Sequence, residues 1–537
     1  MYTSPPTLIA ASKPLPAGTA MAATAITSHT KSFIHKLSRA TESIPTLVAS
    51  LYRFLLFQAN PFWIQSCYFF SLSMAGFLLL KILPLRDVTS KPTNVDLFFM
   101  SVSANTVSSM DAMEMEVFSN YQLVVLTLLM VVGGEVFVSL LGLHFAKIKS
   151  QMKDSSLDAS GMELATLSDQ AELGHQKPNP MPPDMTVLDM KSSSRKHLFF
   201  VVLGYLIVAH VVGFLLILVY LRLVPDAGAV LDRKGINASM FSIFTTVSTF
   251  ANCGFVLTNE NMVVFRTCSG LLLIVIVQAL VGNTMYASSL RAVIWLLKKV
   301  TKRQEYDYLL NNYGEMSYDH LLPGPHALYL ALTVAGLVLL QLILFCCMEW
   351  TSDSLTGLST YQKIVGAMFL SVNSRYAGES IVDLSAISPA ILVLFVVMMY
   401  LPPYTCFLPR EDDRRLLEDG ETSRKTTGLG LILSPLSSIA IFTIIICITE
   451  RRQMSRDPLN FSVLNVVVEV VSAYGTVGYT TGYSCKRQVK ADVHCKDVSA
   501  GFSAKWSNKG KLVLIVVMFF GRLKKFSMGG GKYWQFI

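Results

Sequence analysis

Four loops of the sequence share a pattern of residue types that suits the binding of a cation by backbone oxygens. Each loop follows a short apolar stretch, and together they read VDLFFMSVSANTVSSM, MFSIFTTVSTFANCGF, YQKIVGAMFLSVNSRYAGE and FSVLNVVVEVVSAYGTVGY. Aligned by these stretches, the loops place four residues at one equivalent position: Ser109, Gly254, Gly378 and Gly478. Glycine suits a loop whose carbonyls turn toward an axis, because it reaches positive φ and lets the backbone approach an ion.

The fourth loop carries Thr476–Thr480, TVGYT, which differs by one residue from the TVGYG run of potassium-channel filters. For a single loop, ordinary turn glycines would be a sufficient explanation. Four loops in register, each behind an apolar stretch, argue against that explanation. Only one position carries nearly the same residue type in all four loops. We therefore expect one principal constriction rather than a row of several ion-binding sites.

Residues beside the equivalent position extend the candidate site. Ser108 immediately precedes the residue of the first loop, while Asn252 and Thr476 each stand two residues before a glycine of the set. Glu379 follows the glycine of the third loop directly. Its carboxylate is a candidate for concentrating cations at the outer mouth.

The composition is that of a membrane protein, so we expect these loops to lie among membrane-spanning helices. Of the 537 residues, 52% are hydrophobic and 15% are charged, whereas soluble domains carry about 25% charged residues. A bilayer-spanning helix needs about 20 mostly apolar residues. Eight runs approach or exceed this length: Phe62–Pro84, Tyr121–Ala146, Leu198–Tyr220, Val263–Ser288, Ala327–Met348, Ala390–Leu408, Leu429–Ile448 and Leu512–Phe526. The sequence predicts an all-α polytopic membrane protein.

The runs come in pairs, and each pair encloses one of the four loops. The apolar stretches before the loops are too short and too polar to span, so each fits a half-inserted helix followed by a returning loop. The unit of helix, re-entrant loop and helix therefore occurs four times, as an internal repeat. The predicted repeats are 61–147, 197–298, 326–409 and 429–526, with linkers 148–196, 299–325 and 410–428 and tails 1–60 and 527–537.

Lysine and arginine near the ends of the runs predict the orientation. Their distribution favours a cytoplasmic N-terminus, with the basic segment Thr449–Lys511 as an exception, and no signal peptide is evident. An even number of spans then places both termini in the cytoplasm. Cys485 and Cys495 fall on the predicted outer face, where an oxidising exterior would allow them to pair. Two free thiols are an equal alternative.

Five segments resemble those of the plant HKT transporters, within the Trk/Ktr superfamily of cation transporters. They are TVSSMDAMEMEVFSN, STFANCGFVLTNENM, VNSRYAGE, SAYGTVGYTTGYSCK and FFGRLKKF, in the order and register of that family, and the resemblance runs from about Phe62 to Phe526. It implies four membrane–pore–membrane repeats around a central pathway. It also implies a multi-pass plasma-membrane protein that transports Na⁺, and sometimes K⁺, in Na⁺ homeostasis and salt tolerance.

Carried over from the family, the four equivalent residues are the selectivity filter, and Na⁺ at the filter is the only metal expected. Serine at the first filter position marks the Na⁺-selective members, so Ser109 predicts Na⁺ transport. The alternative is a Na⁺–K⁺ symporter or K⁺ transporter of the same fold, against which Ser109 argues. Thr476 departs from the family pattern, in which asparagine is expected. No enzyme activity and no cofactor are indicated, since no HExxH or Cys/His ligand set is present.

Two further features concern the inner pathway. Arg522 matches the basic residue that raises a barrier to cations below the filter in the family; its other interpretation is an interfacial anchor, like Lys524 and Lys525. Pro402 and Pro403 lie in the sixth run, where they break the helical hydrogen bonds. They indicate either a structural kink or an intramembrane gating loop.

Other partners follow from charge and from acids within the runs. The formal net charge of +9 suits the anionic inner leaflet of a lipid bilayer, so no nucleic-acid partner is needed. The sequence is compatible with a homodimer. Glu135 lies within the second run, and because a buried acid is costly we expect it to pair with a basic group inside the bundle.

Overall fold

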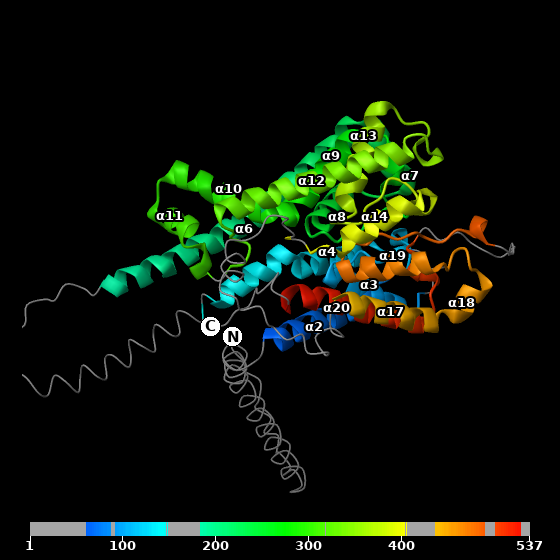
Figure 1. Ribbon diagram of the computed structural model, residues 1–537, viewed down its shortest axis with the longest axis horizontal. Coiled ribbons are helices and arrows are strands. Elements are labelled where there is room, and N and C mark those ends of the chain that lie inside the picture. The colour runs from blue at the N-terminus through cyan, green and yellow to red at the C-terminus, as the bar shows by residue number, and fades with distance from the viewer. Residues whose placement is uncertain are drawn as a thin grey trace, which may run out of the picture. The chain divides into compact units, whose positions relative to one another are not determined.

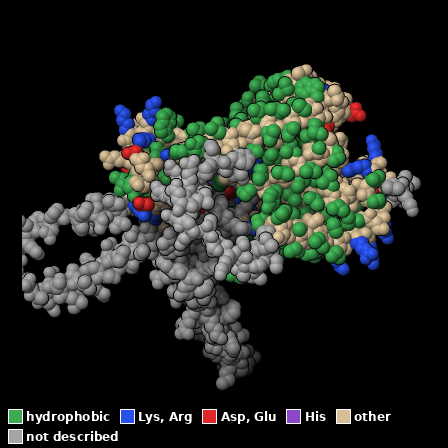
Figure 2. Space-filling view, viewed as in Figure 1, with side chains coloured by type: hydrophobic (Ala, Val, Ile, Leu, Met, Phe, Trp, Pro, Cys, Tyr) green, Lys and Arg blue, Asp and Glu red, His purple; other side chains and the backbone are tan. Residues whose placement is uncertain are grey.

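The computed structural model describes residues 61–86, 92–146, 148, 183–316, 318–402, 404, 435–488 and 500–527. Their regular elements are helices, which Figure 1 shows in chain order from blue to red. This architecture confirms the predicted all-α class. The helices that flank the short central helices are apolar, and many of their large hydrophobic side chains remain exposed, as the green surface in Figure 2 shows. Such a surface is suited to lipid.

Four units of helix, pore helix and helix follow one another along the chain. A pore helix here means the short helix in the middle of each unit. The units are α2 (Pro61–Ile82), α3 (Asn94–Thr106) and α4 (Asn120–Gly133); α6 (Pro183–Leu223), α8 (Ala238–Phe250) and α9 (Ser269–Gly282); α12 (Gly324–Glu349), α13 (Thr360–Asn373) and α14 (Pro389–Tyr400); and α17 (Pro435–Thr449), α19 (Val463–Gly475) and α20 (Asn508–Ser527).

Further helices lie outside this scheme: α7 (Pro225–Lys234) and α18 (Arg451–Arg456) precede the pore helices of the second and fourth units, and α10 (Thr284–Thr301) and α11 (Gln304–Asn311) join the second unit to the third. Neighbouring units also pack on one another: α4 contacts α8, α9 contacts α13, α14 contacts α19, and α20 contacts α3. The last contact closes the four units into a ring.

Each pore helix begins at a residue whose side chain satisfies the free backbone N–H groups of the first turn. These capping residues are Thr93, Asn237, Ser359 and Ser462. Such caps are worth about 1 kcal/mol each, and they fix the start of the helix. Because the pore helices contain only 13 or 14 residues, a fixed start also determines where the loop after each one begins.

Two predicted spans are broken rather than continuous. Within the described residues, α2, α6 and α12 are long and apolar enough to cross a membrane by themselves. α4 is followed by the helix Glu135–Ala146 at a bend of 55°, and α9 by α10 at a bend of 79°. Counting each bent pair as one span gives up to five spans, while α14 and α17 are shorter apolar helices. The predicted runs Tyr121–Ala146 and Val263–Ser288 therefore each contain a bend that the sequence did not predict.

Glycines in three second helices explain how closely the helices approach the pore loops. A Cβ added to Gly133, Gly282 or Gly521 would overlap a backbone carbonyl at the end of a pore helix. The carbonyls belong to Asn105, Phe250 and Tyr474, each four residues before the equivalent loop position. The same backbone contact therefore supports three of the four loops from behind.

We predict that Gly282→Ala destabilises the protein, because its new Cβ meets the Phe250 carbonyl. Overpacking of this kind costs about 1–3 kcal/mol. Thermal unfolding of the detergent-solubilised chain measures the effect. The matched control is Gly336→Ala in α12, where an added Cβ meets nothing within 4 Å. Equal melting temperatures for the two variants would contradict the proposed close packing.

Candidate functional site

The four equivalent loop residues share a left-handed backbone conformation. Their φ angles are 53° for Ser109, 81° for Gly254, 66° for Gly378 and 97° for Gly478. This region is open to glycine and uncommon for other residues, so Ser109 occupies it at a conformational cost. One backbone geometry is therefore repeated at the position that the alignment of the loops selects.

The same four residues lie next to one another in space. A Cβ added to Gly254 would overlap the Ala377 carbonyl and lie 3.1 Å from the Ser109 hydroxyl. One added to Gly378 would lie 2.8 Å from the Gly478 Cα. One added to Gly478 would lie 2.6 Å from the Ser109 hydroxyl. The contacts form a closed circuit in the order of the repeats, with the serine side chain between two glycines.

Hydrogen bonds to the ends of the pore helices hold the loops in register. The amides of Ser108, Cys253 and Val477 each donate to a carbonyl five residues earlier, at 2.8 to 3.0 Å. In the third loop the corresponding bond shifts by one residue, from the Gly378 amide to Asn373. Positive φ angles two residues before the equivalent position recur in the other three loops, at Val107, Asn252 and Thr476. The third loop is thus built differently.

Glu379 does not reach the outer mouth, where the sequence suggested it. Its side chain is fully buried, and its Oε1 accepts a hydrogen bond from Thr249 Oγ1 of α8 at 2.8 Å. The physical reason is its position on the side of the loop that faces the neighbouring pore helix. Glu379 therefore joins the loop of the third repeat to the pore helix of the second.

A second buried acid, Glu469 of α19, was missed in the sequence. Its Oε1 accepts the Ser503 amide at 2.9 Å, and the Ser503 hydroxyl donates to the Asp111 carbonyl at 3.1 Å. These bonds tie the fourth repeat to the loop of the first. An acid within the apolar run VLNVVVEVV was the available signal, since such residues are costly without a partner.

A cavity of about 390 Å³ lies on one side of the ring of loops, and we call it the outer cavity after the orientation that the sequence predicts. Its lining includes the carboxylates of Asp111, Glu114, Glu260 and Asp383, together with Thr480 and Arg487. Backbone of the third and fourth loops also reaches it, at Gly378 and Gly482. The excess of acids over bases gives this mouth a negative character that attracts cations.

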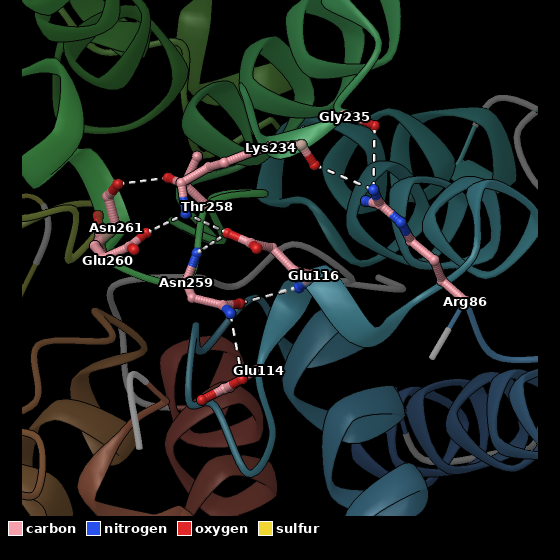
Figure 3. A network of polar contacts seen from close by, with 9 residues as sticks. All are labelled: Arg86, Glu114, Glu116, Lys234, Gly235, Thr258, Asn259, Glu260 and Asn261. Atoms are coloured by element: carbon pink, nitrogen blue, oxygen red, sulfur yellow. Dashed lines mark hydrogen bonds and ion pairs between the residues drawn. The ribbon is translucent and has the colours of Figure 1, made fainter. Parts of the chain in front are cut away.

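Lys234 joins the first two repeats beside this mouth (Figure 3). Its Nζ lies 2.6 Å from a carboxylate oxygen of Glu116 and 2.6 Å from one of Glu260. Partial burial opposes ionisation of Glu260, but the hydrogen bond and charge of Lys234 outweigh it, so the pKa of Glu260 is lowered. The pKa of Lys234 is raised by the two acids against a similar desolvation cost.

Asn259 and Arg86 extend this network, as Figure 3 also shows. The Asn259 side chain accepts the Glu116 amide at 3.0 Å and donates to Glu114 at 3.2 Å. Arg86 donates to the backbone carbonyls of Lys234 and Gly235. The loops that follow the first and second ring positions are therefore fixed to each other.

Below the ring lies an inner cavity of about 220 Å³. It is lined by Glu135, Asn283, Thr284, Arg375, Tyr376, Met399, Tyr400, Leu401, Pro402, Pro435, Tyr474, Gly475, Thr476, Gly521 and Lys524. Thr476 belongs to the fourth loop, so the cavity begins directly beneath the ring. Glu135 shares this wall with the basic residues Arg375 and Lys524, and its pairing with a basic group stays a prediction.

Arg375, three residues before Gly378, links the third loop to the end of α14. Its guanidinium is mostly buried and donates to the Pro402 carbonyl at 2.6 Å. α14 ends at Tyr400, two residues before Pro402, and Pro403 lies outside the described residues, so the kink or gating loop stays a prediction. Sequence reasoning missed Arg375, because its partner is 27 residues away and has no side-chain donor or acceptor.

Arg522 lies on α20 with only 1% of its surface exposed. It donates to the Gly133 carbonyl, and its guanidinium lies 5.6 Å from the ring centre of Phe69. The cavity wall from α20 includes Gly521 and Lys524 instead. The guanidinium is therefore enclosed where α4 bends, close behind the inner cavity. This position also differs from that of an exposed interfacial anchor.

Cys485 is disulfide-bonded in the structure. Cys495, its partner in the sequence-based pairing, lies outside the described residues. The pairing of the two cysteines therefore stays a prediction.

Comparisons with known proteins agree with this ring architecture. A family model described as TrkH, cation transport protein, matches residues 186–405 and 432–529, which is more than half of the chain. The chain therefore belongs to this family of cation transport proteins, and it is a multi-pass transporter rather than an enzyme.

Two plant transporters are similar to this chain over most of their length. "Sodium transporter HKT1" of Arabidopsis thaliana is 48% identical over 83% of this chain and 89% of its own length. "Cation transporter HKT1;3" of Oryza sativa subsp. japonica is 46% identical over 93% of this chain and 96% of its own length. The crystal structure of the potassium transporter TrkH from Vibrio parahaemolyticus covers 89% of this chain with a TM-score of 0.50 and 14% identity, which supports the fold. The predicted resemblance to plant HKT transporters is confirmed.

We predict that Lys234→Met lowers the melting temperature at pH 7, because Glu116 and Glu260 would face each other without their cation. For such partly exposed pairs the loss is about 1 kcal/mol. Since Lys234 lowers the pKa of Glu260, this stabilisation is complete above the unfolded-state pKa of about 4.5 and is lost as pH falls through the folded-state pKa.

Thermal unfolding at pH 7 and near pH 4 measures this difference. Lys509→Met, which removes an exposed lysine at the start of α20, is the control for lost charge alone. A deficit of Lys234→Met that is the same at both pH values would exclude the ionic explanation.

Proposed function

We propose that this chain transports Na⁺ across the plasma membrane through the ring of Ser109, Gly254, Gly378 and Gly478. The observation that carries the proposal is the closed circuit of these residues, with the Ser109 hydroxyl next to two glycines. The 48% identity to a relative named as a sodium transporter supports the choice of ion. A role in Na⁺ homeostasis and salt tolerance is part of the same proposal.

Selectivity follows from the uneven ring. K⁺ exchanges its hydration shell for an even cage of carbonyls, although cavity size and ligand field strength are both held responsible for its selection. The Ser109 side chain narrows the ring on one side. There it presents a hydroxyl, where glycine would present only backbone. Na⁺ is smaller and can keep part of its water while it passes such a ring.

A Na⁺–K⁺ symporter or K⁺ transporter of the same fold is the second candidate. Three of the four ring positions are glycine, which favours carbonyl coordination of K⁺. The ion dependence of the current distinguishes the candidates: a current that follows only external K⁺ would overturn the Na⁺ proposal.

The pathway below the ring is proposed to contain both the barrier to cations and the gate. The positive charge of Arg522 lies close behind the inner cavity, and because its side chain is only 1% exposed, solvent screens the charge weakly. Arg375 holds Pro402, so the chain after α14 can act as a gating loop fastened to the third pore loop. The acidic outer cavity supplies cations to the ring.

The proposal also includes the orientation of the chain in the membrane. Both termini lie in the cytoplasm, because the distribution of lysine and arginine favours that orientation. One chain contains all four repeats and thus one complete pathway. A homodimer would place two such pathways side by side in the bilayer.

We predict that Ser109→Gly admits K⁺ while Na⁺ transport is retained, because it restores a ring of four glycines. A tenfold change in selectivity corresponds to about 1.4 kcal/mol, which is reasonable for one hydroxyl and a small steric change. Reversal potentials in mixed Na⁺ and K⁺ measure the gain as a new dependence on external K⁺. A variant that reaches the surface, conducts Na⁺ and stays insensitive to K⁺ would remove Ser109 as the determinant of selectivity.

We predict that Arg522→Gln increases the Na⁺ current per surface-expressed molecule and alters rectification. Glutamine can keep a hydrogen bond to the Gly133 carbonyl while it removes the charge. Two-electrode recording, normalised to surface protein, measures the change, and Arg522→Lys is the control that keeps the charge. Wild-type current in Arg522→Gln would mean that the residue serves only packing.

A further inference from the structure

The second helices of the first three repeats are each interrupted beside the end of a pore helix. α4 bends into the helix Glu135–Ala146, α9 bends into α10, and α14 ends at Tyr400. The residues at these interruptions contact the last turn of a pore helix: Gly133 meets Asn105, Gly282 meets Phe250, and Met399 meets Gly475. The pieces of chain that follow begin at residues that all line the inner cavity, namely Glu135, Thr284 and Leu401.

One side chain from each piece reaches a buried cluster around Tyr318 and His320, which lie between α11 and α12. The Ser139 hydroxyl lies 3.2 Å from the Tyr318 hydroxyl, and the Tyr286 hydroxyl lies 2.6 Å from it. Tyr404, after α14, shares a hydrogen bond with Nδ1 of His320 through its hydroxyl. We call these five residues the histidine–tyrosine cluster. Through it, the three pieces of chain are joined to one another at a single place.

Burial makes this cluster depend on its internal contacts. Tyr286, Tyr318 and His320 are buried, and a buried hydroxyl or imidazole is costly unless it is hydrogen-bonded. Burial also lowers the pKa of His320 to about 4, although the charge of Glu135 acts in the opposite direction, so the imidazole is neutral near pH 7. The His320 ring packs edge to face on three tyrosine rings, with centres 5.0 Å (Tyr286), 5.3 Å (Tyr318) and 5.6 Å (Tyr404) away. These contacts define the position of each ring.

The chain after α14 forms part of the wall of the inner cavity, which Leu401 and Pro402 line. Arg375 of the third pore loop donates to the Pro402 carbonyl at 2.6 Å. Two residues further on, His320 holds Tyr404. The wall is therefore fastened both to the ring and to the histidine–tyrosine cluster.

We propose that the contact between His320 and Tyr404 positions the chain after α14 as a wall of the inner cavity, and that its loss widens the cation pathway. The proposal rests on the gate proposed above, to which it adds the residues that hold the gating loop in place. Because the contact lies away from the ring, its loss changes the passage of cations through the cavity and leaves the choice of ion unchanged. Through Tyr318, the same cluster couples this wall to the bent continuations of α4 and α9.

Tyr404→Phe tests this role, because it removes the hydroxyl and keeps the ring, which packs against Leu330 and Val334 of α12. Leu401→Cys, in the full-length, detergent-solubilised chain, supplies a thiol at the cavity wall. Its rate of modification by a trimethylammonium methanethiosulfonate reports the position of that wall, after subtraction of the reaction of the native cysteines. We expect about fivefold faster modification when Tyr404→Phe is added, which is the shift that the loss of one hydrogen bond produces.

Tyr205→Phe is the matched control for a lost buried hydroxyl. That hydroxyl bonds Ser289 at 2.7 Å and the Val281 carbonyl at 3.0 Å, so its contacts lie within the second repeat, and the modification rate should stay that of the unaltered background. His320→Leu should accelerate modification as much as Tyr404→Phe, and the two together should add nothing, because both remove the same bond. An unchanged rate in Tyr404→Phe, or additive effects of the two variants, would overturn the proposal.

Recording of the Na⁺ current separates this proposal from the proposed gate. Tyr404→Phe should increase the current per surface-expressed molecule about fivefold, for the same reason as above, with the reversal potential unchanged. Faster thiol modification with unchanged current would support the position of the wall and overturn the gate proposed for it. A shifted reversal potential would mean that the variant acts on the ring, and the inference would then be wrong.

Discussion

The rest of the structure depends on one backbone constraint, the left-handed turn at the equivalent position of the four pore loops. At that turn each of the four loops reverses direction after its pore helix. Three of the four residues at the turn have no room for a side chain. The caps at the starts of the pore helices, and the glycines of the second helices behind their ends, all serve to hold this turn. A shift of any pore helix by one residue would move a different residue into the ring.

The third repeat departs from the others, and its departures are connected. Its loop has no left-handed residue two positions before Gly378, and its amide bond to the pore helix is displaced by one residue. The altered backbone coincides with Arg375, whose side chain turns down to Pro402. The irregular backbone of the third loop thus accompanies a direct contact between Arg375 and Pro402, which lies farther along the chain, after α14.

The sequence was sufficient to align the four loops, because each apolar stretch is short and ends at a recognisable cluster of small residues. It also predicted the helical class. It failed for Glu379, whose burial depends on Thr249 of a different repeat, and for the bends after Gly133 and Gly282. Those features arise from packing between segments far apart in the chain, and local composition carries no information about such partners.

The occurrence of all four loops in one polypeptide has a consequence for the evolution of the ring. In a symmetric tetramer of identical chains, any substitution appears four times, so a small gain at one place is accompanied by three further changes. Here position 109 is serine and its three counterparts are glycine. Because one polypeptide supplies all four loops, a single substitution alters one quarter of the ring and leaves the other three positions unchanged.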